Sequence, residues 1–219
     1  IDQKVKKVIA LSTDKASSPV NLYGATKLCS DKLFTASNSY SGEHGTKFSV
    51  VRYGNVVGSR GSVVPFFKER AKSGELPITD FRMTRFLITL SEAVETVLFA
   101  FRKMHGTEIF VKQIPSVKIV ELAKAIGPNA KLKEIGLRPG EKLHEQMIGF
   151  EDAPYTYEYP NHYKILPSIN DWNKDPERIG EGIKVDTDFT YCSDSNSDWM
   201  DIETLQSWIH ENLNNIGKI

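Results

Sequence analysis

Residues 12–28, STDKASSPVNLYGATKL, gather five side chains that can donate, accept or stabilise protons: Thr13, Asp14, Lys15, Tyr23 and Lys27. The tyrosine and the second lysine are four residues apart, so on a helix they share one face about a turn apart. A tyrosine acts as a base near pH 7 only if its pKa falls by ~3 units from ~10, which takes ~4 kcal/mol. A nearby lysine ammonium supplies part of that stabilisation, so the spacing indicates a lysine-assisted tyrosine base.

The acid and the first lysine follow a predicted strand, VKKVIALST at 5–13. In open α/β sheets, sites form beyond the carboxyl ends of the strands, which is where Thr13, Asp14 and Lys15 stand. The alternative is a solvated Asp-Lys turn ahead of a helix, and the spacing alone does not decide between them.

The rest of the chain alternates strand and helix patterns. Strands are predicted at 5–13, 46–56 and 108–111, and helices at 21–40, 63–74, 90–104, 116–127 and 201–213, with Ser91 as the N-cap of the helix at 90–104. This order predicts an α/β fold: the C-terminal part of a Rossmann-like doubly wound parallel sheet with a smaller mixed substrate-binding lobe. We expect residues 1–130 to form the Rossmann-like part with interleaved substrate-binding segments, and 131–219 to form the lobe and C-terminal tail.

Bulk composition excludes several classes of protein. The 28 basic and 28 acidic residues leave no net charge to attract nucleic acid or an anionic membrane. No apolar run reaches the ~18–20 residues of a membrane span. Two cysteines and five scattered histidines show no metal-ligand spacing and no disulfide framework. The sequence therefore predicts a cytoplasmic globular protein that binds no metal, nucleic acid or membrane.

Five segments together resemble a known family: STDKASSPVNLYGATKL, SVVRYGNVVGSRGSVVPFF, PITDFRMTRF, EIFV and GLRPGEKLHE. They are similar to the extended short-chain dehydrogenase/reductases that act on nucleotide sugars. Within that family they resemble the soluble, C5-inverting UDP-N-acetylglucosamine 4,6-dehydratases, which open pseudaminic acid biosynthesis. The resemblance implies the substrate UDP-N-acetylglucosamine, the cofactor NADP with NAD as the alternative, and a homo-oligomer.

The resemblance also implies roles for the first cluster. Tyr23 would take the proton of the sugar C4 hydroxyl, Thr13 would hydrogen-bond that hydroxyl, and Lys27 would hold the phenolate and the nicotinamide ribose. The 4-ketone acidifies the C5 proton, so Lys15 as base and Asp14 as acid at the C6 hydroxyl would eliminate water. An Asp14–Lys15 contact would also favour the charged pair, which leaves the acid–base assignment open.

Four residues further along resemble substrate contacts. Asn55 follows the strand SVVRYG and would contact the diphosphate region. Arg85 and Arg138 would bind the diphosphate through their planar guanidinium forks, and Glu141 would reach the uridine ribose. Arg82, three residues before Arg85, is a weaker candidate of the same kind.

A dinucleotide enzyme also needs a glycine-rich turn for the cofactor pyrophosphate. Gly54, Gly58 and Gly61 have the wrong spacing for it, so we expect that turn to lie upstream of Ile1. Two other functions stay open. A nucleotide-sugar 4-epimerase needs the Tyr-xxx-Lys pair but not Asp14 and Lys15. A non-catalytic remnant would bind sugar nucleotide without a cofactor.

Overall fold

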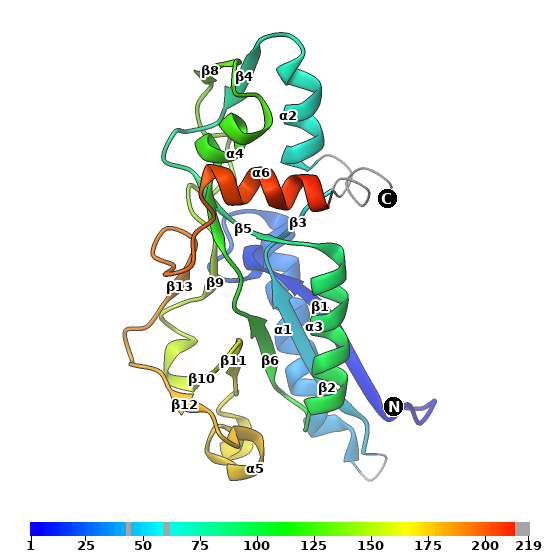
Figure 1. The fold of residues 1–219 in the computed structure, drawn as a ribbon. Coiled ribbons are helices and arrows are strands. Elements are labelled where there is room, and N and C mark those ends of the chain that lie inside the picture. Colours follow the sequence, from blue (N-terminus) through cyan, green and yellow to red (C-terminus); the bar gives the residue numbers. More distant parts are fainter. Residues whose placement is uncertain (43–44, 59–61, 213–219) are drawn as a thin grey trace. The chain divides into compact units, whose positions relative to one another are not determined.

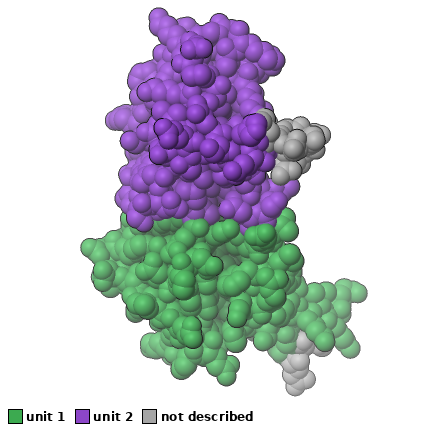
Figure 2. Space-filling view, in the orientation of Figure 1, with its two compact units in different colours: residues 1–53, 94–113, 146–191 green, residues 54–93, 114–145, 192–219 purple. Residues whose placement is uncertain are grey.

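The computed structural model describes residues 1–42, 45–58 and 62–212 (Figure 1). The chain forms two compact units, shown in Figure 2: unit 1 comprises 1–53, 94–113 and 146–191, and unit 2 comprises 54–93, 114–145 and 192–219. The chain thus passes between the units several times. The sequential division near residue 130 differs from this interleaved arrangement and stays a prediction about domain organisation.

Unit 1 is built on a six-stranded sheet in the order β1-β2-β6-β11-β10-β12. Its first three strands are parallel, and β11 and β10 continue the sheet in antiparallel fashion. The bounds are β1 Lys7–Thr13, β2 Lys47–Tyr53, β6 Ile109–Lys112, β11 His162–Ile165, β10 Thr156–Tyr159 and β12 Ile183–Lys184. Parallel strands joined through helices are the hallmark of α/β folds, so the predicted fold class is confirmed.

The two long helices of unit 1 lie on opposite faces of this sheet (Figure 1). Helix α1, Leu22–Tyr40, lies on the face that carries Arg52. Helix α3, Leu90–Lys103, packs through Ala100 on the other face, against Val51 and Phe110. The remaining elements of this unit are short: η1 Asp14–Ala16, β9 Gln146–Ile148, η3 Ala153–Tyr155, η4 Ile169–Lys174 and α5 Pro176–Ile179, with β13 Tyr191–Cys192 at its end.

One edge of the unit 1 sheet carries exposed apolar side chains. Among the described residues β1 is the edge strand, and its Leu11 is 48% exposed. On the same face of the sheet, α3 exposes Val94, Leu98 and Phe101 along one flank. An unpaired edge strand next to exposed apolar surface is a site where further structure or another chain adds.

A buried arginine connects three segments of unit 1. Arg52 on β2 is 2% exposed. Its Nη2 donates to Asp31 Oδ2 on α1 at 3.0 Å, and its Nη1 donates to the Met147 carbonyl at 2.6 Å and to Asp152 Oδ2 at 3.1 Å. The guanidinium therefore fixes α1 and the segment 147–152 against the sheet.

In its described residues, unit 2 contains two smaller sheets and three helices. One sheet has the order β3-β5-β7 and the other pairs β4 with β8. A core of aliphatic side chains and Phe67 joins them to the helices. The bounds are β3 Asn55–Val56, α2 Val63–Ala71, β4 Glu75–Ile78, β5 Thr84–Ile88, β7 Ser116–Lys118, α4 Ile119–Ile126, β8 Lys131–Glu134 and α6 Ile202–Glu211.

Two helix starts differ from the sequence expectation. The α3 cap is Thr89 rather than Ser91: the Thr89 hydroxyl accepts from the Glu92 amide at 3.1 Å, and Glu92 Oε2 accepts from the Thr89 amide at 2.8 Å. This reciprocal capping box satisfies two amides at once, which Ser91 at its position inside the first turn cannot do. The segment predicted as a helix from 116 begins as strand β7, because Ser116–Lys118 pair with β5.

Across the described ranges, none of the helices combines the length and the apolar character that crossing a membrane requires.

Replacing Arg52 by methionine should lower the free energy of unfolding by ~3–5 kcal/mol, because it leaves the buried Asp31 carboxylate without its cation. Adding Asp31→Leu should recover most of that loss, since a well-packed apolar pair often replaces a buried ion pair at little cost. Urea unfolding followed by circular dichroism measures both. Lys72→Met is the control, because the exposed Lys72–Glu69 pair contributes under ~1 kcal/mol. Equal midpoints for the parent and Arg52→Met would show that the pair is not a structural anchor.

Candidate functional site

The carboxyl end of β1 holds three of the predicted site residues in direct contact. The Thr13 hydroxyl donates to Asp14 Oδ1 at 2.8 Å, and Lys15 Nζ donates to the same oxygen at 3.1 Å. Thr13 also caps the short turn η1, because its hydroxyl accepts from the Lys15 amide at 3.4 Å. The Asp–Lys contact considered in the sequence analysis is therefore present, and Asp14 and Lys15 are not a pair of separately solvated side chains.

The carboxyl group of Asp14 is enclosed by its neighbours. Its side chain is 0% exposed, whereas that of Lys15 is 33% exposed. Asp14 Oδ2 is buried and has no hydrogen-bond partner among the described residues. A proton that moves between Asp14 and a ligand must therefore pass through the Thr13 hydroxyl or the Lys15 amine, or the carboxyl must first turn outward.

Helix α1 brings the second pair of predicted residues to the same end of the sheet. Asn21 caps the helix by accepting from the Gly24 amide at 2.8 Å. Lys27 Nζ, one turn beyond Tyr23, donates to the Leu11 carbonyl of β1 at 3.1 Å. Tyr23 itself is 53% exposed, so its phenol is open to a ligand. Tyr23 and Lys27 thus lie on one helix, as the sequence predicts, and the Lys27 contact joins that helix to β1.

Gly24 allows the first turn of α1 to approach η1 closely. A Cβ at this position would lie 2.3 Å from the Lys15 carbonyl oxygen and 3.0 Å from the Pro19 Cβ. Real side chains do not reach such distances, so any larger residue would push the turn that carries Asp14 and Lys15 away from the helix that carries Tyr23.

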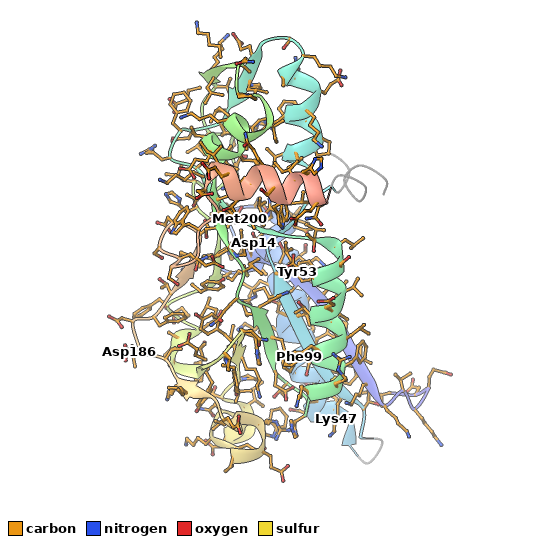
Figure 3. The ribbon with its side chains drawn as sticks, viewed as in Figure 1. Asp14, Lys47, Tyr53, Phe99, Asp186 and Met200 are labelled. Atoms are coloured by element: carbon orange, nitrogen blue, oxygen red, sulfur yellow. The ribbon has the colours of Figure 1, made fainter. Side chains whose placement is uncertain are left out.

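Tyr53 is a further residue of this region that the motif comparison did not identify. It ends β2 directly opposite Thr13, and Figure 3 shows it on the same side of the sheet end as Asp14. Burial raises the pKa of the Tyr53 phenol, and the negative charge of an ionised Tyr23 raises it further. Its position at the carboxyl end of the second parallel strand is the signal that could have identified it.

The four predicted substrate contacts all line one cavity of about 310 Å³ in unit 2. Asn55 reaches it from β3 and Arg85 from β5, while Arg138 and Glu141 come from the segment that follows β8. These residues are separated by up to 86 positions in the chain, and the fold of unit 2 alone brings them together. Their role as substrate contacts stays a prediction.

Arg85 uses most of its donors on the main chain. Its Nη1 donates to the carbonyls of Thr84 at 2.7 Å and Leu143 at 3.0 Å, and its Nη2 donates to the Lys142 carbonyl at 2.9 Å. Glu141 Oε1 lies 3.8 Å from Nη2. The guanidinium is 8% exposed, so in this structure it orders the loop that carries Glu141 and presents only a small surface to the cavity.

Arg138 offers its guanidinium more freely. It is exposed, and within the described ranges its side chain makes no hydrogen bond or ion pair. It stands in the same tight turn as Glu141, whose amide donates to the Arg138 carbonyl at 3.1 Å. Arg82, the weaker candidate, is bound to Asp80 through two nitrogens and does not line the cavity. Hydrogen bonds from Arg82 lower the pKa of Asp80 to about 2.

Sequence reasoning missed the apolar part of this cavity. Its walls are formed by Val63, Phe66, Phe67, Pro77, Met83, Ile119 and Ile135. Most of these residues are indistinguishable in sequence from core positions. Phe66 and Ile135 are the exceptions in structure, because they are 40% and 50% exposed. The Arg70 guanidinium carbon lies 5.7 Å from the Phe66 ring centre.

The family comparison matches most of the chain. The sequence profile described as "Polysaccharide biosynthesis protein" matches residues 1–167. The chain belongs to this family. Within it, the curated "UDP-N-acetylglucosamine 4,6-dehydratase (inverting)" of Campylobacter jejuni is 58% identical over 202 residues, covering 89% of this chain and 60% of that protein. The resemblance inferred from the five segments is therefore confirmed.

Two further proteins are similar to this chain, one in sequence and one in solved structure. The "UDP-glucose 4-epimerase" of Rickettsia canadensis is 42% identical and covers 79% of this chain and 52% of that protein. The solved "X-ray structure of Pen from Bacillus thuringiensis" has a TM-score of 0.84 and 32% identity, and it covers 97% of this chain and 64% of that one. The chain thus spans about 60% of the length of the Campylobacter relative.

Two substitutions, Arg138→Met and Arg85→Met, should distinguish a residue that contributes to UDP affinity from one that also contributes to stability. Arg138→Met should weaken UDP binding by at least about tenfold and leave the thermal midpoint unchanged, because the loss of one charge-assisted contact removes ~1.5–3 kcal/mol. Arg85→Met should lower the thermal midpoint as well, because it releases three carbonyls of the segment 84–143. Calorimetric titration with UDP and scanning calorimetry measure the two effects. Tight UDP binding by Arg138→Met would remove this residue from the site.

Proposed function

We propose that this chain carries the acid–base residues and the sugar-nucleotide pocket of a C5-inverting UDP-N-acetylglucosamine 4,6-dehydratase. The observation that carries the proposal is the contact between Asp14, Lys15 and Thr13 at the carboxyl end of β1, beside the helix of Tyr23 and Lys27. The identity to the Campylobacter dehydratase supports it. We further propose that the reaction is the first step of pseudaminic acid biosynthesis, in the cytoplasm, in a homo-oligomer.

Oxidation at C4 requires a base for the hydroxyl proton. Tyr23 is exposed to the ligand and accepts this proton as phenolate. The Thr13 hydroxyl donates to Asp14, so it meets the sugar hydroxyl as an acceptor. Lys27, fixed by the Leu11 carbonyl, stabilises the phenolate by its charge.

Tyr23 and Lys27 also fit the nicotinamide end of a dinucleotide. With one proton of Lys27 Nζ engaged by Leu11, two N–H donors remain for ribose hydroxyls. A bound nicotinamide dinucleotide, NADP or alternatively NAD, supplies the hydride acceptor and donor that the overall conversion needs. Within the described ranges no glycine-rich strand–turn–helix holds a pyrophosphate. Gly61, one of the three glycines whose spacing was judged wrong for a pyrophosphate-binding turn, lies outside the described residues.

Elimination of water from C5 and C6 requires an acid and a base at adjacent carbons. Lys15, as the neutral amine, takes the C5 proton, and Asp14, as the carboxylic acid, supplies the proton that leaves with the C6 hydroxyl. The contact at 3.1 Å means that one proton transfer converts the ion pair into this acid–amine form. The closed environment of Asp14 directs its proton through the Thr13 hydroxyl or requires the carboxyl to turn outward.

The cavity of unit 2 suits the nucleotide part of the substrate. Apolar walls accept a planar base, and Arg138 provides the cation that a diphosphate needs. Glu141, in the same turn, accepts from ribose hydroxyls, and Asn55 adds an amide contact to the diphosphate region. The pocket's charge and the oxygen-rich substrate are complementary in this arrangement.

The 42% identity to an epimerase favours one competing function, nucleotide-sugar 4-epimerisation. An epimerase needs the tyrosine and its lysine only. The buried Asp14 bound to Lys15 has no task in that reaction, so the acid–base pair favours dehydration.

Tyr23→Phe should abolish turnover, by at least a hundredfold, because it removes only the ionisable oxygen. The assay uses the chain joined to the N-terminal part of the Campylobacter dehydratase, with UDP-N-acetylglucosamine and NADP, and product detection by mass spectrometry. UDP affinity should stay within about twofold, since the phenol lies in unit 1 and the nucleotide contacts lie in unit 2. Parental activity in this variant would remove Tyr23 as the base.

Asp14→Asn should block loss of water while oxidation at C4 continues. We expect absorbance of the reduced cofactor at ~340 nm to rise transiently with no 6-deoxy product. Asp2→Asn, a carboxylate at the far end of the chain's first segment, serves as the matched control. A parental rate of water loss would exclude Asp14 as the acid, and formation of the C4 epimer by the parent protein would favour the epimerase instead.

A further inference from the structure

Unit 1 contains a second cavity, of about 290 Å³, that takes no part in the proposed reaction. It lies between α3, β6 and the start of β11, roughly a quarter-turn around α3 from the exposed apolar residues Val94, Leu98 and Phe101. Phe99, labelled in Figure 3, lies on the side of α3 toward β6. The volume is close to the lower end of small-molecule sites, ~300–1,000 Å³.

One face of α3 supplies much of the cavity wall. Glu95, Phe99 and Arg102 follow one another at intervals of four and three residues, so they form a single row along the helix. Arg102 and Glu95 make no hydrogen bond or ion pair in the part of the chain that the structure describes. The buried Thr96 adds a hydroxyl beside this row.

Aromatic rings form the floor of the cavity. The His162 ring meets Phe99 edge-on at 4.9 Å and lies near-parallel to Phe110 at 6.2 Å. Behind it, Tyr159 stacks on His162 at 4.5 Å with the planes 10° apart. Rings packed edge-to-face and offset in this way accept a further ring in the same geometry.

His162 enters this group as a neutral ring. Burial and the charge of Lys164 lower its pKa to about 4. Its Nδ1 lies 3.0 Å from Asn161 Oδ1, and an amide oxygen only accepts, so Nδ1 carries the hydrogen. Nε2 is therefore an acceptor, and it has no partner among the described residues.

We infer that this cavity is a second small-molecule site, distinct from the sugar-nucleotide pocket, for a one- or two-ring aromatic anion that also carries a hydrogen-bond donor. The aromatic floor accepts the ring. Arg102, which makes no ion pair within the described ranges, provides the cation for an anionic group of the ligand, and Lys112 adds positive charge to the wall. Glu95 and His162 Nε2 accept from the donor of the ligand.

The test uses 2-aminobenzoate as a fluorescent probe and its neutral analogue 2-aminobenzamide, each titrated into the protein. We expect saturable binding of the acid and binding at least tenfold weaker for the amide. Arg102→Gln should weaken binding of the acid at least tenfold, or ~1.4 kcal/mol, and Arg102→Lys should retain part of it. Lys103→Gln, an exposed cation on the next position of α3, is the matched control and should bind as the parent does.

Three outcomes overturn the inference: no saturable binding, equal loss in Arg102→Gln and Lys103→Gln, or displacement of the probe by UDP. The last would place the probe in the unit 2 cavity. Because Arg102 is exposed, its replacement does not threaten folding, and circular dichroism of each variant verifies this. Failure of this test leaves the dehydratase proposal untouched, since none of the residues changed here belongs to the acid–base cluster or to the cavity of unit 2.

Discussion

Three segments of unit 1 that are far apart in sequence converge on one guanidinium. Arg52 donates to a helix side chain 21 residues before it, to a carbonyl 95 residues after it and to a carboxylate 100 residues after it. A buried cation of this kind is tolerated only when its partners are in place, so it couples the helix of Tyr23 and Lys27 to the sheet. The neighbouring residue on β2 is Tyr53, which faces the opposite side and stands level with Thr13. The position of the helix that carries the proposed base Tyr23 thus depends on a contact that does not involve Tyr23.

The residues of the proposed reaction fall in both units. Unit 1 holds the residues that we propose as acid and base, while unit 2 holds the cavity that we propose for the nucleotide. Each half is ordered by its own interactions: the buried Arg52 in the first, and the Arg85 contacts with the loop 141–145 in the second. Under the proposed function, a change in the cavity of unit 2 would leave the contacts of Arg52, Asp14 and Lys15 in unit 1 in place.

Much of the fold could be predicted because the type and spacing of apolar residues within short segments indicate strands and helices. Short apolar and β-branched runs predicted β1 and β2, and helical spacing predicted α1 and α3 to within a few residues. The four residues that line the cavity of unit 2 were named from the family motifs, and their role stays a prediction. The state of Arg85 could not be predicted, because its partners are carbonyls 57 and 58 residues away and a carbonyl has no sequence signature. The apolar wall of the unit 2 cavity could not be predicted for a related reason. Phe66 and Phe67 are adjacent in sequence, but their exposed fractions, 40% and 2%, depend on the tertiary fold.

The contact between Asp14 and Lys15 also bears on how many protons the two side chains hold during the proposed elimination. If the lysine gains a proton from C5 and the aspartic acid loses one to the departing hydroxyl, the pair ends as carboxylate and ammonium, 3.1 Å apart, which is the arrangement seen here. The total number of protons on the two groups is then the same before and after elimination. Restoring the starting form needs only an internal transfer along the existing hydrogen bond. The hydrogen taken from C5 arrives on Lys15, which is 33% exposed, so a hydrogen isotope there would exchange with solvent unless it first moved to the buried Asp14.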